Sequence, residues 1–75
     1  MMPKQFKTGY GEPIDVGQRF ILDGKIYKIE KLEVIRYAGL IGTYIGEDGN
    51  AYKTNLSTVT YDTEKRLWKP REKKY

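Results

Sequence analysis

The side chains of this 75-residue chain that are best suited to binding chemistry lie near its C-terminal end. Residues 1–63 hold eight cationic and eight acidic side chains, whereas residues 64–75 hold six cations and two acids, so the net charge of +4 comes entirely from the last twelve residues. Those six cations are Lys65, Arg66, Lys69, Arg71, Lys73 and Lys74. Clustered cations suit sequence-independent contacts with nucleic-acid phosphates, and Trp68 between them offers a ring on which a base can stack. A solvated tail that only carries charge is the alternative interpretation.

Aromatic side chains are the second candidate group. The chain has seven Tyr, two Phe and one Trp, more than a core of this size encloses, so some rings are expected to face solvent. If Tyr44 and Lys53 pair across a hairpin, they form, with Tyr52, a spot where a base stacks and a phosphate is bound. Exposed tyrosines also anchor protein interfaces, and many only pack on a thin core with their hydroxyls in water.

Catalysis is not expected. The chain has no Cys and no His, which excludes a disulfide scaffold, a zinc finger, a Cys nucleophile and a Ser-His-Asp triad. The glycine-containing stretch at residues 39–46 lacks the Gly-Lys-Ser/Thr ending of a phosphate-binding loop, and Asp48 and Asn50 lack the remaining ligands of a calcium loop. Scattered carboxylates such as those of Glu30 and Glu33 are expected on solvated faces. We therefore expect no catalytic residue, no metal site and no cofactor.

The clearest structural signal is a β-hairpin centred on Asp23-Gly24. These two residues separate two β-prone runs, and a type I′ turn requires the positive φ that Asp and Gly tolerate. A two-residue loop predicts Leu22 opposite Lys25 and Phe20 opposite Tyr27.

The second strand of this hairpin is expected to run toward Tyr37. Its apolar positions change parity near Glu30 and Lys31, which predicts a bulge or a sharp bend there. A helix over residues 28–37 is the rival interpretation, and β-branched residues in this stretch disfavour it.

Two further hairpin turns are expected, at residues 47–50 and 62–65. The first follows a strand at residues 40–45 and pairs Ile45 roughly with Tyr52. The second sets Trp68 near Val59.

Five or six short antiparallel strands with tight turns predict an all-β fold, closed into a small SH3-like barrel that leaves few free strand edges. A five-stranded OB barrel is the alternative. The expected organisation is an irregular N-terminal arm at residues 1–17, rich in Gly and Pro, a β-barrel domain at residues 18–69, and a basic C-terminal tail at residues 70–75.

A resemblance to a known class of domains rests on residues 16–29, VGQRFILDGKIYKI. This segment resembles the opening hairpin of SH3-like small barrels, including KOW-type domains, although it lacks the second glycine that the KOW pattern has near Lys28. The chain is also similar in style to small β-rich accessory proteins of bacteriophages. The resemblance implies a fold whose members bind RNA, DNA or protein.

The sequence therefore predicts a non-enzymatic domain whose partner is nucleic acid, either RNA or DNA. The alternative is a protein-interaction module, such as a phage-type accessory or inhibitor protein or a small structural subunit, which meets an acidic protein surface. The first residues do not form a signal peptide, and no apolar run is long enough to cross a bilayer, so a cytoplasmic protein with no membrane partner is expected.

Overall fold

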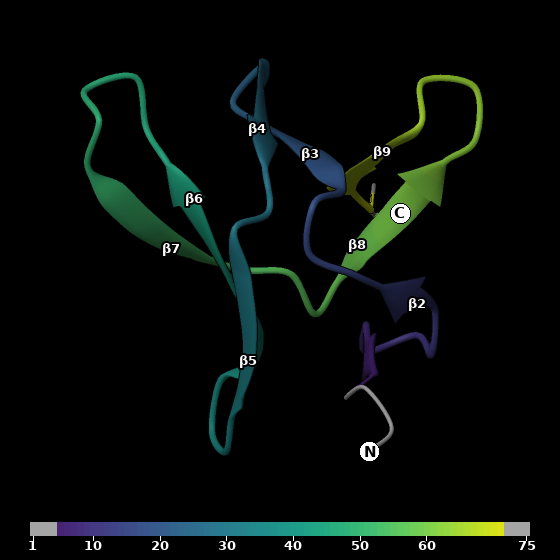
Figure 1. The fold of residues 1–75 in the computed structure, drawn as a ribbon. Coiled ribbons are helices and arrows are strands. Elements are labelled where there is room, and N and C mark those ends of the chain that lie inside the picture. The colour runs from purple at the N-terminus through teal and green to yellow at the C-terminus, as the bar shows by residue number, and fades with distance from the viewer. Residues whose placement is uncertain (1–4, 72–75) are drawn as a thin grey trace.

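The computed structural model describes residues 5–71, and within that range the chain forms nine short strands and no helix. The strands are β1 (Phe6–Lys7), β2 (Pro13–Ile14), β3 (Arg19–Leu22), β4 (Lys25–Lys28), β5 (Lys31–Ile35), β6 (Gly39–Ile45), β7 (Ala51–Asn55), β8 (Val59–Asp62) and β9 (Leu67–Pro70). The all-β prediction is confirmed, and the rival helix over residues 28–37 is absent (Figure 1).

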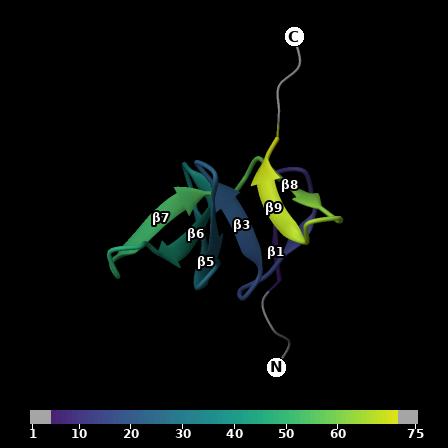
Figure 2. The ribbon, with the colours of Figure 1, turned by 90° about the horizontal axis from the view of Figure 1, so that it is seen from above.

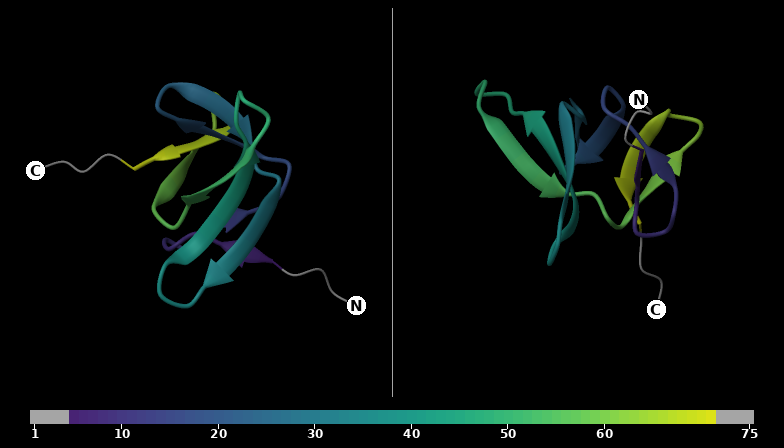
Figure 3. Two further views of the ribbon diagram at one scale, coloured as in Figure 1. Left: turned by 90° about the vertical axis from the view of Figure 1, so that its left-hand side faces the viewer. Right: turned by 60° about the horizontal axis from the view of Figure 1, so that its bottom comes forward.

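The strands form three sheets that do not close into a barrel. Their orders are β1-β2, β4-β3-β9-β8 and β5-β6-β7. Figures 1 and 2 show β7 and β8 on opposite sides of the molecule, so the far edges of the two larger sheets face away from each other. The expected closure is therefore not observed (Figure 3).

The predicted bend at the end of the first hairpin is what separates the two larger sheets. β4 ends at Lys28 and β5 begins at Lys31. Between them, the amide of Ile29 donates to the carbonyl of Gln18, next to β3, whereas the amide of Glu30 donates to the carbonyl of Thr43 in β6. Adjacent residues thus bond to different sheets, and the long expected strand is divided between them.

The hairpin of β3 and β4 has the predicted register. Leu22 lies opposite Lys25 and Phe20 opposite Tyr27. Asp23 and Gly24 have φ values of 51° and 79°, as a type I′ turn requires.

The hairpin of β6 and β7 differs from the prediction by one residue. Tyr44 lies opposite Tyr52, and Ile45 lies opposite Ala51 rather than Tyr52. The turn includes Gly46, whose amide donates to the carbonyl of Asn50 over 2.8 Å, so the loop is one residue longer than expected. Because side chains alternate along a strand, this shift decides which face each residue occupies.

The last hairpin also has a register different from the predicted one, because its four-residue turn lies one residue later, at 63–66 instead of 62–65. Trp68 lies opposite Tyr61 instead of near Val59. The strand was expected to begin at Arg66, but this residue has a φ of 57° and its amide closes the turn on the carbonyl of Asp62 at 2.8 Å.

The core lies between the two larger sheets and the N-terminal segment. Its most fully enclosed large side chains are Trp68, Phe20, Ile29 and Leu56. The segment expected to be an irregular arm contains the paired strands β1 and β2, and Ile14 of β2 belongs to the core. This segment is attached by the amide of Gly9, which donates to the carbonyl of Ser57 over 2.6 Å.

Candidate nucleic-acid interface

The predicted phosphate-binding residues near the C-terminal end do not form one continuous tail. Lys65 and Arg66 lie in the turn between β8 and β9, and Lys69 lies on β9; all three are exposed. Arg71 directly follows β9. Lys73 and Lys74 lie outside the described residues.

Trp68 is enclosed in the core, with 2 % of its surface exposed. Its ring packs edge-on against Tyr61 at a centroid distance of 5.1 Å, and its Nε1–H donates to Oε1 of Gln18 at 2.9 Å. A base has no access to a ring in this position, so the expected stacking role of Trp68 does not fit its location.

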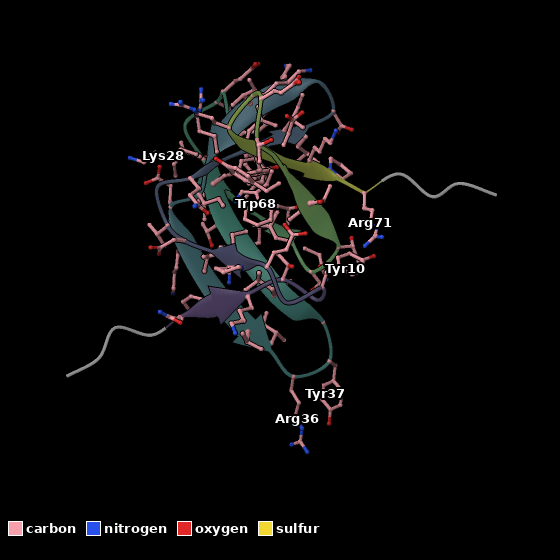
Figure 4. All side chains as sticks on the ribbon, turned by 90° about the vertical axis from the view of Figure 1, so that its right-hand side faces the viewer. Tyr10, Lys28, Arg36, Tyr37, Trp68 and Arg71 are labelled. Carbon is pink, nitrogen blue, oxygen red and sulfur yellow. The ribbon has the colours of Figure 1, made fainter. Side chains whose placement is uncertain are left out.

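Arg71 contacts the N-terminal segment. Its guanidinium lies 4.3 Å from the centroid of the Tyr10 ring, and its amide donates to the carbonyl of Thr58 at 3.3 Å. Figure 4 shows Arg71 and Tyr10 together on one side of the molecule and Lys28 on the other, with Trp68 between them.

The four-stranded sheet carries cations that sequence reasoning did not select. Arg19 on β3 lies directly opposite Lys28 on β4, and both side chains are exposed. Like charges in directly opposed positions repel each other across a hairpin. The register predicted from the sequence already places Arg19 opposite Lys28. Two like charges in opposed positions could therefore have identified these residues as candidates for anion binding.

The parallel pairing of β3 with β9 adds Lys69 to the same face. Phe20 is the neighbour of Trp68, and both point into the core. Their sequence neighbours point the opposite way, which places Arg19 and Lys69 on the outer face of the sheet. Parallel strands begin at the same end of a sheet, so the turn that precedes β9 lies at the end where β3 begins. We call Arg19, Lys28, Lys65, Arg66 and Lys69 the cationic sheet face.

Two carboxylates lie within or next to this face, on Asp62 and Glu64. Asp62 Oδ2 is 3.6 Å from Lys69 Nζ, and Asp62 Oδ1 accepts the amides of Lys65 and Glu64 at 3.1 and 3.0 Å. The amide of Lys65 is the largest of the influences that lower the pKa of Asp62. Because exposed ion pairs are weak and screened by salt, Lys69 remains available to a phosphate.

The aromatic part of the predicted site is elsewhere and is separated from Lys53. Tyr44 and Tyr52 stack at a centroid distance of 5.8 Å on one face of the β5-β6-β7 sheet. Lys53 is opposite Thr43 and therefore on the other face, where its Nζ lies 3.0 Å from Glu33 Oε1. The expected pairing of Tyr44 with Lys53 is wrong, because it depended on the one-residue error in register.

The turn beside Tyr52 is acidic, with Glu47 and Asp48, and Figure 1 shows it on the opposite side of the molecule from the β8–β9 turn. The predicted single site is thus two surfaces: the cationic sheet face, and an aromatic group beside carboxylates.

No protein-family model, curated protein or solved structure matches this chain at a significant level. Residues 5–71 contain no group of three or more acidic side chains placed to hold a metal ion. In the same range there is no helix that is long and apolar enough to span a membrane.

Proposed function

We propose that this chain is a non-enzymatic domain that binds nucleic acid through phosphate contacts made by the cationic sheet face. The observation that carries this proposal is the convergence of Arg19, Lys28 and Lys69 on one side of three neighbouring strands. Lys65 and Arg66 extend the same surface at the end where β3 and β9 begin.

Phosphate is the group that this surface suits. The opposed pair Arg19 and Lys28 lowers its own repulsion when an anion lies between the two side chains. Arg also donates in a fork that matches phosphate oxygens. The accessible apolar side chains that share the face are Ile21 and Ile26, which offer no ring for base stacking, whereas Leu67 on the same side of β9 is buried. Contacts of this kind position a nucleic-acid backbone without selecting a sequence.

Two finer predictions belong to the same proposal. The charge of the last twelve residues suggests that Arg71, Lys73 and Lys74 also contact phosphate, and a cytoplasmic location fits a nucleic-acid partner. The likeness to SH3-like small barrels is supported by the β3–β4 hairpin, and we propose that the two unclosed sheets are an open form of that architecture.

The test compares two double variants that remove equal charge. Arg19→Gln with Lys28→Gln changes the cationic sheet face, whereas Lys31→Gln with Arg36→Gln removes two exposed cations from the β5-β6-β7 sheet and the turn after β5. Figure 4 shows Arg36 far from Lys28. Fluorescence anisotropy with mixed-sequence RNA and DNA oligonucleotides, across roughly 50 to 200 mM salt, gives affinity and its salt dependence.

We expect the first double variant to lower the slope of log K against log salt by about 2, equally for different sequences, because each lost phosphate contact contributes about 0.9. The control pair should leave the slope nearly unchanged. If both pairs weaken binding equally, net charge alone is responsible and the assigned surface is wrong. If the native chain shows no salt-dependent binding, the function is wrong.

A protein partner is the second candidate, and one specific observation favours it. Three tyrosine rings and two carboxylates line a hollow at the other side of the molecule, where phosphate would be repelled.

A further inference from the structure

A hollow of about 350 Å³ lies between the tips of two hairpins. Its aromatic wall consists of Tyr27 from β4, Tyr44 from β6 and Tyr52 from β7, and the turn at residues 46–48 forms the remainder. The ring centroids of Tyr27 and Tyr44 are 4.6 Å apart, and those of Tyr44 and Tyr52 are 5.8 Å apart. Phe20 packs behind Tyr44 at 5.3 Å, so the row of rings is anchored in the core.

Hydrogen bonds hold the outermost ring. The Tyr52 hydroxyl donates to Asp48 Oδ2, and Asp48 Oδ1 accepts the amide of Asn50 at 3.0 Å. These donors lower the pKa of Asp48, first through the Tyr52 hydroxyl, so the carboxylate is charged at neutral pH. The same bond raises the pKa of Tyr52, whose ring therefore remains neutral.

Gly46 allows the ring of Tyr52 to lie close to the backbone. A Cβ at this position would be 2.6 Å from Cε2 of Tyr52 and 3.1 Å from Oδ1 of Asp48. Any larger residue would displace the ring from the hollow, so the shape of the site depends on this glycine.

We propose that this hollow binds the guanidinium group of an arginine side chain presented by a protein partner. The faces of aromatic rings attract cations, and tyrosine is among the better rings for this interaction. A guanidinium is planar and weakly hydrated, so it stacks on a ring more readily than an ammonium does. Glu47 and Asp48 supply negative charge at the rim, and the volume is within the usual range for sites that hold a small group.

Lys25 supplies an internal precedent for a cation at this rim. Its Nζ lies 3.0 Å from Oε1 of Glu47, and the bond to Glu47 raises the pKa of Lys25. Both side chains are more than half exposed, so the pair is weak and an incoming cation can replace it. A nucleic acid is disfavoured here because its phosphates would meet two carboxylates.

The test is an NMR titration of the ¹⁵N-labelled full chain with N-acetyl-arginine N-methylamide. The citrulline analogue has nearly the same shape without the charge and serves as the matched control probe. We expect arginine to shift the amides of Gly46, Gly49 and Tyr52, and citrulline to leave them in place. Equal shifts with citrulline would overturn the proposal, as would arginine shifts confined to other residues.

Three variants assign the binding to these groups. Tyr52→Leu, Asp48→Asn and Glu47→Gln should each weaken the arginine affinity by about two- to fivefold, the range for an exposed cation on a ring or in an exposed ion pair. Tyr37→Leu is the control, since this residue is 92 % exposed in the turn between β5 and β6, which lies at the opposite end of β6 from the turn at residues 46–48 (Figure 1). Glu47→Gln leaves the ring packing untouched, so it decides the matter if either of the other two variants unfolds.

Two further probes test which class of ligand the hollow prefers. Choline that binds more tightly than the arginine probe would replace the guanidinium with a quaternary ammonium ligand and overturn the proposal. Oligonucleotide that shifts the same three amides would make the hollow a base-stacking site and overturn it as well. Arg19→Gln with Lys28→Gln should leave the amide shifts caused by the arginine probe unchanged. The arginine proposal can therefore hold even if the cationic sheet face does not bind nucleic acid.

Discussion

Trp68 combines a large buried ring with a single polar atom that needs a partner. Gln18 supplies that partner, and its Oε1 also accepts the amide of Asp15 at 2.8 Å. A buried indole N–H without an acceptor would be costly, so the half-buried side chain of Gln18 stabilises the core although it is polar.

The position of Trp68 leads to a spectroscopic prediction. Its emission should be blue-shifted in the folded protein and poorly quenched by iodide, because the ring is enclosed. An oligonucleotide bound to the cationic sheet face should leave the intensity almost unchanged, whereas stacking would quench it. Urea-unfolded protein provides the control for full quenching. Strong quenching by the oligonucleotide in the folded state would contradict the buried position.

Individual residues also explain why the binding surfaces were only partly predictable. The distribution of charge along the chain identified Lys65, Arg66 and Lys69 as candidates. It did not identify Arg19 and Lys28, because acidic residues elsewhere in residues 1–63 balance their charge. Their place on the same face as Lys69 depends on the contact of Phe20 with Trp68, which no local pattern encodes.

At the scale of elements, turn chemistry decided which hairpins were predictable. The pair Asp23-Gly24 permits a two-residue loop with positive φ at both positions, and the register follows from that alone. The turns at residues 46–50 and 63–66 are longer, and several loop lengths fit their sequences equally well. In the second, Arg66 has a positive φ that its residue type does not suggest, so the register was misplaced.

The β8–β9 turn also gives a prediction about acid stability. Hydrogen bonds from the amides of Lys65 and Glu64 lower the pKa of Asp62 below its usual 3.8. A carboxyl group whose pKa is lower in the folded state than in the unfolded state stabilises the fold at pH values above the unfolded-state pKa. This contribution is lost as the pH falls through the folded-state pKa. The stability contributed by Asp62 should therefore be present at pH 7 and be lost progressively as the pH falls below about 4.

Thermal melts between pH 7 and pH 3 check this expectation. Asp62→Asn should melt at a lower temperature than the native chain at pH 7, and the two melting temperatures should converge at the acid end. Asp15→Asn is the control, since Asp15 is exposed and lies outside this turn. A constant difference between the two chains at every pH would rule out the proposed role of the Asp62 carboxylate.

At the scale of the whole molecule, one shared core joins two sheets that no ladder connects. Ile29 is at the junction and is 0 % exposed. Its amide bonds toward β3, and the next amide bonds toward β6. The two sheets are therefore expected to unfold together, although their strand edges remain separate.

Two probes test this cooperativity during urea unfolding. Trp68 fluorescence follows the four-stranded sheet, and the NMR signal of Gly42 follows the β5-β6-β7 sheet. The two midpoints should coincide. Ile29→Ala should lower both midpoints together and reduce the free energy of unfolding by about 2 to 5 kcal/mol, whereas the exposed Ile26→Ala should reduce it much less. Separate midpoints in the native chain would mean that the sheets are independent units.

Short β-prone runs and tight turns were sufficient to predict the all-β class. They were not sufficient to predict that the sheets remain open. The parity change near Glu30 and Lys31 predicted a bend but contained no information about which sheet each half would join. That choice depends on the distant partners of the two halves, which are Gln18 for Ile29 and Thr43 for Glu30.

The parallel contact between β3 and β9 has a consequence for synthesis on the ribosome. Phe20 emerges early and cannot acquire its neighbour Trp68 until nearly all of the described chain has been translated. Until the segment with Trp68 is available, the chain must therefore keep one edge of β3 unpaired and the Phe20 ring without its final neighbour, and chains in that condition are prone to aggregation and to capture by chaperones.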